Sequence, residues 1–190
     1  MSKKIICIFG LAGSGKSMQV NLLGKYFKLE VIRASRLLRE FNKKDIKVKG
    51  WWEKEAGMQF TEERLNDLNI DRAFDQKLAM LVKKGNVIVD SWSLPWLLKK
   101  EELCSIYLIA SQETRAKRIS ERDKIKKEQA LQAVKKRDLE NVKLFYNLYN
   151  ARIDKDFNKF NLVLQTDALG INQVFEILKA FIKQYYKTKR

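Results

Sequence analysis

The sequence predicts one α/β domain, a three-layer α/β/α sandwich built on a five-stranded parallel sheet. Short apolar runs alternate along the chain with longer amphipathic stretches, which is the pattern of repeated strand–helix–strand units. The first apolar run, residues 4–9, is continuous and rich in isoleucine, as expected of a central strand buried on both faces. The chain has 190 residues, of which 45% are hydrophobic, and this is typical of a single globular core.

The expected strands are the short apolar runs at residues 4–9, 29–32, 86–90, 103–109 and 162–165. Between them apolar residues recur at helical spacing, which predicts helices at about residues 16–27, 35–41, 70–84, 111–123 and 128–149, and a closing helix around residues 174–182. Gly85 stands where a helix C-terminal cap is expected, and Pro95 is expected to open a short helix over residues 96–100. Residues 42–69 show little apolar periodicity, and we expect them to form a mobile excursion from the core.

The composition excludes several kinds of chemistry. Lys and Arg total 39 against 23 Asp and Glu, a formal net charge of +16, and the chain has no His. A Ser-His-Asp triad, an HExxH zinc site and imidazole acid–base catalysis are therefore excluded. The positive charge favours an anionic partner, which could be nucleic acid, an acidic membrane surface or a phosphorylated small molecule.

Two further features bear on the cellular compartment. Cys7 and Cys104 both lie within apolar runs, which favours buried thiols over a disulfide and fits a reducing compartment. The apolar run at residues 5–9 is too short for a signal peptide or a membrane span. We therefore expect a cytoplasmic protein with no membrane partner.

Residues 10–17 read Gly-Leu-Ala-Gly-Ser-Gly-Lys-Ser and match the phosphate-binding pattern G-x-x-x-x-G-K-[ST]. The motif lies between an expected buried strand and an expected helix, so backbone amides and the helix N-terminus can face one anion. This context favours a P-loop NTPase fold over a glycine-rich turn with an incidental lysine. Lys16 is expected to reach the β- and γ-phosphates, and the Ser17 hydroxyl to bind Mg²⁺. The expected ATP-binding residues are Gly10, Leu11, Ala12, Gly13, Ser14, Gly15, Lys16, Ser17 and Met18.

Asp90 ends the expected strand at residues 86–90, where a carboxylate can hold the water shell of the metal. We therefore expect Asp90 to contact Mg²⁺ through water. Residues 42–45 match a guanine-binding pattern in their letters, but they do not follow a late strand of the sheet. Residues 90–93 also lack the glycine of the GTPase D-x-x-G pattern, so a GTPase is disfavoured.

Three arginines indicate which P-loop chemistry to expect. Arg118 and Arg122 lie four residues apart on one expected helix, and Arg137 lies on the next. Transfer between two phosphorylated substrates needs several cations that converge from mobile segments, although a salt-bridged helical hairpin would also place them there. We expect Arg122 and Arg137, together with Lys16, to be catalytic.

With these residues the chain resembles the nucleoside monophosphate kinases, and most of all the archaeal-type cytidylate kinases. The resemblance covers nearly the whole chain. In the first half of the chain, residues 34–39 are similar to the family's S-x-G-x-x-x-R segment, residues 70–75 to I-D-R-x-x-D, and residues 84–89 to K-G-N-V-V. In the second half, residues 115–122 are similar to the LID entry R-A-x-R-I-x-x-R, and Arg137 stands at the LID exit. Residues 160–167 are similar to the last strand and the loop beside adenine.

The resemblance implies roles for residues that no local pattern assigns. Arg39 and Arg72 would clamp the acceptor phosphate, and Asp71 or Asp75 would read the acceptor base. Arg118 would lie against adenine. The chain would form one domain, residues 1–190, with a monophosphate-binding region at about residues 35–84 and a LID at about residues 121–137. The segments near residues 42–69 and 121–137 would close over the substrates.

Three positions depart from the family pattern: Ser35 replaces a glycine, Trp92 an arginine, and Leu144, beside Lys143, a second LID arginine. The sequence therefore predicts a monomeric kinase that uses Mg²⁺ and transfers the ATP γ-phosphoryl group to a nucleoside monophosphate, with CMP or dCMP preferred. An adenylate- or uridylate-type kinase, an RNA-associated P-loop protein with little turnover, and a catalytically silent nucleotide-binding regulator are the alternatives.

Overall fold

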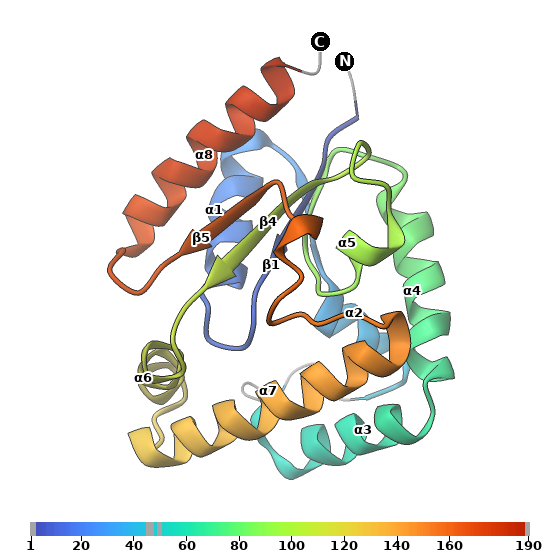
Figure 1. Ribbon diagram of the computed structural model, residues 1–190, viewed down its shortest axis with the longest axis vertical. Coiled ribbons are helices and arrows are strands. Elements are labelled where there is room, and N and C mark those ends of the chain that lie inside the picture. The colour runs from blue at the N-terminus through green and yellow to red at the C-terminus, as the bar shows by residue number, and fades with distance from the viewer. Residues whose placement is uncertain (1–2, 45–47, 49–50, 189–190) are drawn as a thin grey trace.

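The protein is an α/β/α sandwich around a parallel sheet (Figure 1). The computed structural model describes residues 3–44, 48 and 51–188. In the described part of the chain the sheet has five strands in the order β2-β3-β1-β4-β5, and every neighbouring pair is parallel. The strands are β1 (Ile5–Phe9), β2 (Glu30–Arg33), β3 (Val87–Asp90), β4 (Cys104–Ile109) and β5 (Leu162–Gln165). This confirms the predicted fold class and all five predicted strands to within a residue or so.

The helices also follow the prediction, with two exceptions. They are α1 (Lys16–Phe27), α2 (Ala34–Phe41), α3 (Glu55–Asn66), α4 (Asn69–Val82), α5 (Leu94–Leu97), α6 (Gln112–Asp123), α7 (Lys127–Tyr149) and α8 (Ile171–Lys187), with 3₁₀ turns at Trp51–Glu53 and Phe157–Lys159. The short helix predicted for residues 96–100 is α5, which begins earlier, so that Pro95 lies in its first turn.

Helix α3 is the other exception, because the sequence predicted an irregular excursion there. Its buried positions are Gly57, Phe60, Thr61 and Arg64, which have helical spacing, yet only Phe60 is a large apolar residue. A search for apolar periodicity therefore cannot find this helix, which tertiary packing stabilises. Within the expected excursion, residues 45–47 and 49–50 lie outside the described part of the chain.

Strand β1 lies at the centre of the sheet, and Ile6, Cys7, Ile8 and Phe9 are completely buried. Helices α1 and α8 cover one face, where Val20, Leu23 and Leu178 pack against the sheet. Helices α4 and α5 cover the other face, where Leu78 and Leu94 belong to the core. Cys7 and Cys104 are both buried and form no disulfide, as predicted.

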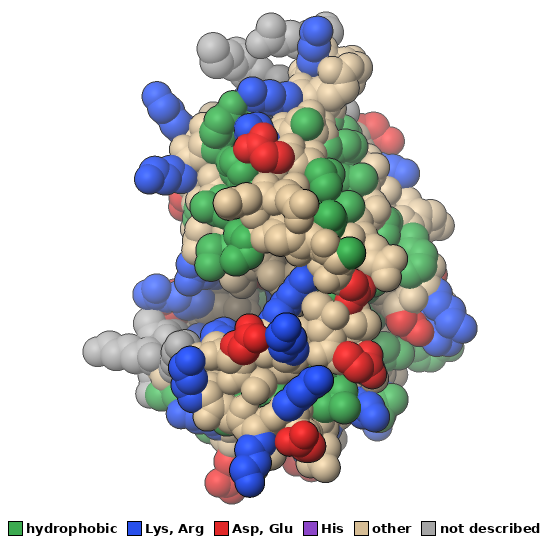
Figure 2. Space-filling model, turned by 90° about the vertical axis from the view of Figure 1, so that its left-hand side faces the viewer, with side chains coloured by type: hydrophobic (Ala, Val, Ile, Leu, Met, Phe, Trp, Pro, Cys, Tyr) green, Lys and Arg blue, Asp and Glu red, His purple; other side chains and the backbone are tan. Residues whose placement is uncertain are grey.

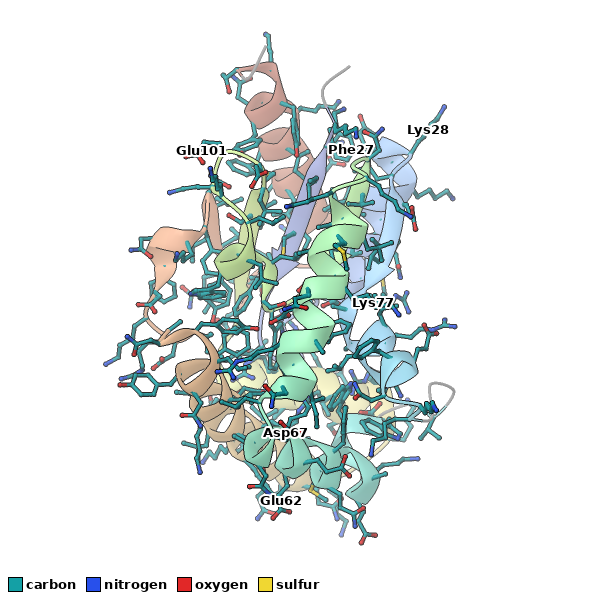
Figure 3. The ribbon with its side chains drawn as sticks, turned by 90° about the vertical axis from the view of Figure 1, so that its right-hand side faces the viewer. Phe27, Lys28, Glu62, Asp67, Lys77 and Glu101 are labelled. Carbon is teal, nitrogen blue, oxygen red and sulfur yellow. The ribbon has the colours of Figure 1, made fainter. Side chains whose placement is uncertain are left out.

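Parallel strands place all their carboxyl ends at one edge of the sheet, where ligands bind in open α/β folds. Figure 1 shows α7 crossing the molecule at this edge, with both chain termini at the opposite end. Figure 3 shows α4 lying over the sheet and α3 below it, with Asp67 at the turn between them and Lys28 and Glu101 at the far end. None of the described helices combines the length and the apolarity needed to cross a membrane.

Candidate active site

The phosphate loop joins the end of β1 to the start of α1. Gly13 and Gly15 have φ angles of +82° and +91°, which only glycine adopts without a steric penalty. No side chain caps the helix that starts at Lys16, so its first backbone N–H groups remain available for an anion. The loop therefore has the conformation that the sequence motif predicts.

Lys16, Ser17 and Asp90 meet beside this loop. The Ser17 hydroxyl donates a hydrogen bond of 2.5 Å to Oδ2 of Asp90, and Lys16 Nζ lies 4.0 Å from Oδ1. Asp90 is only 5% exposed, and it is held at the end of β3 next to β1. The predicted metal-side pair is thus formed by residues that are far apart in the sequence.

A cavity of about 1040 Å³ extends from the phosphate loop to α7. It is lined by most of the predicted site residues: Ala12, Gly13, Ser14, Gly15, Lys16, Ser17, Met18, Arg39, Asp71, Asp75, Asp90, Arg118, Arg122 and Arg137. Gly10, Leu11 and Arg72 do not line it. Figure 2 shows the molecule hollowed at mid-height, above a lower part on which basic side chains crowd.

The start of α4 corrects one predicted role. Asp71 and Asp75 are buried and face the cavity, but Arg72 is exposed, because one residue along a helix turns the side chain by about 100°. Arg64, from α3, lies at the cavity instead. Its Nε and Nη2 donate to Asp71 at 2.8 and 2.6 Å, a bidentate pair buried under Trp52. The sequence did not predict Arg64, and only the unrecognised helix α3 carries it there.

Asp75 lies one helical turn beyond Asp71 on α4 and is also buried. The Tyr149 hydroxyl donates a hydrogen bond to its carboxylate, and burial raises the pKa of Asp75 to about 6. Burial and the neighbouring carboxylate raise the pKa of Tyr149 as well, so the phenol stays protonated. Asp75 is therefore an ionised hydrogen-bond acceptor above pH 6.

Helix α7 lines the cavity with a stripe at four-residue intervals, Arg137, Asn141, Phe145 and Tyr149, and with Glu140 beside it. Asn141 is 5% exposed, and its Nδ2 has no hydrogen-bond partner in the described structure. A buried amide donor without a partner costs free energy unless a ligand satisfies it. This stripe extends from the phosphate loop to the Asp75 end of the cavity.

Arg118 and Arg122 line the cavity from α6, the helix that packs against α7. Arg118 donates to the Thr166 carbonyl at 2.8 Å and to its hydroxyl at 3.2 Å, so it connects α6 to the loop after β5. Arg122 forms a 2.5 Å ion pair with Asp123, and its side chain is 46% exposed. Both predicted arginines line the cavity; Arg118 bonds the loop after β5, and Arg122 pairs with the adjacent Asp123.

The sequence matches the cytidylate kinase-like family model over residues 5–168. The chain belongs to this family. It is 30% identical to the cytidylate kinase of Staphylothermus marinus, over 96% of this chain and 98% of that one. It is 33% identical to the cytidylate kinase of Pyrobaculum islandicum, over 94% of this chain and 92% of that one.

Solved structures agree on the fold. An uncharacterised protein from Eubacterium ventriosum superimposes with a TM-score of 0.67 at 17% identity, covering 95% of this chain and 99% of that one. Shikimate kinase from Bacteroides thetaiotaomicron gives 0.62 at 11% identity, covering 96% and 99%. These neighbours have the fold of P-loop kinases, in agreement with the family assignment.

The departures from the cytidylate kinase pattern fall in different places. Trp92 lines the cavity, where its Nε1 donates to the Gly10 carbonyl at 2.8 Å and its ring lies 5.8 Å from Lys16 Nζ. Leu144 is completely buried and lies away from the cavity. Ser35 lines the cavity near Arg39. The substitutions at Ser35 and Trp92 therefore change the cavity wall, and the one at Leu144 does not.

Proposed function

We propose that this protein transfers the γ-phosphoryl group of ATP to CMP or dCMP, giving ADP and the nucleoside diphosphate. One observation carries the proposal: a single cavity joins the phosphate loop to a second half lined by arginines, buried carboxylates and aromatic rings. Its volume of about 1040 Å³ accommodates more than one ligand of drug size. Two phosphorylated substrates can therefore meet in it.

The donor half binds the triphosphate. Loop amides and Lys16 hold the β- and γ-phosphates, and Arg118 and Thr166 lie beside the adenine side of the cavity. Ser17 and Asp90 supply the hard oxygen atoms that Mg²⁺ prefers, and phosphate oxygens and water would complete its shell. When bound, the ion neutralises charge on the transferring group.

The transfer step depends on positioning and charge, and no general base is required. Arg137 reaches the cavity from α7 and Arg122 from α6, so both can face the phosphoryl group between donor and acceptor. Arg39, 9% exposed and 5.2 Å from the Trp51 ring, clamps the acceptor phosphate. Water must be excluded to prevent ATP hydrolysis, and we propose that parts of residues 42–69 and 121–137 close for this purpose.

Asp75 favours a base that carries an amino group. Its ionised carboxylate accepts a hydrogen bond from the exocyclic amine of cytosine or adenine, but it would face the O4 carbonyl of uracil, which is also an acceptor. The preference for cytosine over adenine is supported by the relatives, which are named cytidylate kinases. CMP and dCMP are thus the proposed acceptors.

Initial rates of ADP release test the proposal, measured with ATP, Mg²⁺ and CMP, dCMP, UMP or AMP in turn. We expect kcat/KM for CMP or dCMP to exceed that for UMP and AMP by tenfold or more, about 1.4 kcal/mol. Faster turnover of AMP or UMP would mean that this monophosphate, and not CMP or dCMP, is the preferred acceptor. If no monophosphate is turned over appreciably and the protein binds RNA with an affinity that falls steeply with salt, the result would favour an RNA-associated protein over a kinase.

A further inference from the structure

A buried side chain, Arg115, connects the α6–α7 hairpin to the phosphate loop, and Arg118 of the same helix adds a longer hydrogen bond of 3.4 Å to the Ser14 carbonyl. Arg115 is 3% exposed, and its guanidinium contacts three separate parts of the fold. Nε donates to the Ala110 carbonyl at the end of β4 at 3.1 Å, and Nη1 donates to the Ala12 carbonyl of the phosphate loop at 3.1 Å. Both acceptors are backbone carbonyls, so the first bond ties Arg115 to the end of β4 and the second ties it to the phosphate loop itself.

The third contact is with α7. Nη1 and Nη2 of Arg115 donate to the two carboxylate oxygens of Asp138 at 3.0 and 2.5 Å, and Gln112 donates to the same carboxylate at 3.0 Å. Asp138 follows Arg137 directly in the sequence, and Arg137 lines the cavity. The fork thus fixes the turn of α7 that carries a proposed catalytic cation.

Packing reinforces these hydrogen bonds. A Cβ atom added to Gly13 would lie 2.8 Å from the Arg115 carbonyl oxygen, so the loop rests on the backbone of α6. Ala12 is buried in a small apolar cluster with Ala116, Ile119, Ala130 and Val134, contributed by both helices of the hairpin. Loop and hairpin are therefore packed together on both sides of the Arg115 guanidinium.

We infer that Arg115 and Asp138 are positioning residues that hold Arg137 in register with the phosphate loop. A buried ion pair adds little to stability compared with an apolar pair of similar size, but it fixes geometry through directional hydrogen bonds. Because catalysis by placed charges loses rate steeply with small displacements, this geometry matters for transfer. The role in turnover rests on the proposed function, whereas the mechanical connection does not.

The position of the pair also divides the hairpin. In this antiparallel arrangement Arg115 is near the start of α6 and Asp138 is at mid-length of α7, so residues 116–137 form the part that projects beyond the pair. Arg137 lies directly beside the pair, and Arg122 lies toward the tip. The pair therefore sets the position of Arg137 directly, and Arg122 lies about two helical turns beyond Arg115.

Asp138→Asn tests the inference, because it keeps the size of the side chain and one acceptor oxygen but removes the charge and the second acceptor. We expect kcat to fall by about tenfold to 100-fold, with KM for ATP within about twofold of wild type. A double-mutant cycle with Arg137→Ala should be strongly non-additive, the double variant being no slower than Arg137→Ala alone. Asp154→Asn, which breaks the exposed Arg152–Asp154 pair, is the matched control and should keep the wild-type rate.

Hydrogen exchange of the protein without nucleotide tests the connection independently of turnover. In Asp138→Asn, amides of residues 12–17 should exchange at least about threefold faster, although the change is on α7. If Asp138→Asn does not fold, Arg115→Lys, which keeps the charge and loses the fork, takes its place. Additive rate effects, or faster exchange confined to α7, would overturn the inference. If the wild-type protein does not phosphorylate CMP, the proposed function is refuted. The connection through Arg115 and Asp138 is then decided by the hydrogen-exchange measurement alone.

Discussion

Two glycines of the phosphate loop allow the close packing of the loop on α6 to be measured. Both have a left-handed backbone, with φ of +82° at Gly13 and +91° at Gly15, but their surroundings differ. A Cβ atom at Gly13 would lie 2.8 Å from the Arg115 carbonyl oxygen and 3.0 Å from its Cβ. At Gly15 nothing lies within 4 Å of the added atom. Alanine at each position therefore separates backbone strain from steric overlap.

The expected magnitudes follow from this difference. A left-handed conformation costs alanine about 1–2 kcal/mol, and the smaller entropy of its unfolded chain returns about 0.4–1 kcal/mol. Gly15→Ala should thus lower the free energy of unfolding by about 1 kcal/mol. Gly13→Ala has the same backbone cost and in addition pushes against backbone, which overpacking data put at about 1–3 kcal/mol. We expect a total of about 2–4 kcal/mol.

Urea unfolding followed by far-UV circular dichroism, without nucleotide and at one pH, measures both variants against wild type. The slopes of the transitions should be unchanged, so that the midpoints report stability alone. Equal losses for the two variants would refute the reasoning, because they would mean that the loop does not rest on α6. A larger loss for Gly15→Ala would refute it more strongly.

Three other outcomes are expected. Lys16→Ala should lower kcat by at least about 100-fold at an unchanged melting temperature, because a placed cation at the transferring phosphate is lost; initial rates and thermal melts check this. Arg39→Ala should raise the acceptor KM or lower kcat by about tenfold or more, whereas Arg72→Ala should stay within about twofold of wild type. Comparable effects of the two substitutions would mean that Arg72 does contact the acceptor. Burial raises the pKa of Asp75 to about 6, above the value of about 4 in the unfolded chain, so folding binds a proton in this window and stability falls as pH rises from about 4 to 6. Urea titrations at several pH values should show that this pH dependence, a change of at most about 3 kcal/mol in the free energy of unfolding, is absent in Asp75→Asn. The same pH dependence in the variant would exclude Asp75 as its source.

The donor half of the site could be read from local sequence. The strand, the glycine turn and the helix that form it are continuous, so the spacing of Gly13, Gly15 and Lys16 defines the backbone conformation. The helix expected over residues 111–123 is α6, in which the Ser111 hydroxyl accepts the Thr114 amide as the N-cap. Asp90 was found because parallel strands must bring their carboxyl ends to one edge.

The end of the cavity formed by α3 and α4 was predicted less well, for a reason that Arg72 and Arg64 illustrate. The resemblance indicated a cation near the start of α4, but one position along a helix decides whether a side chain faces the cavity or solvent. Phe74 and Leu78 of α4 pack in the core on this face of the sheet, and this packing contributes to the rotation of the helix. Helix α3, whose buried stripe is mostly polar, gave no periodic signal at all.

The sequence by itself determined the parallel sheet, the phosphate loop and the pairing of Ser17 with Asp90, because each depends on short-range spacing or on the common direction of the strands. Only the tertiary structure decided that Arg64 and not Arg72 faces the cavity, that Tyr149 bonds Asp75, and that Arg115 joins the loop to α7. Those contacts depend on how helices rotate and pack against one another. Packing of that kind is a property of the whole core, and no local stretch of sequence specifies it.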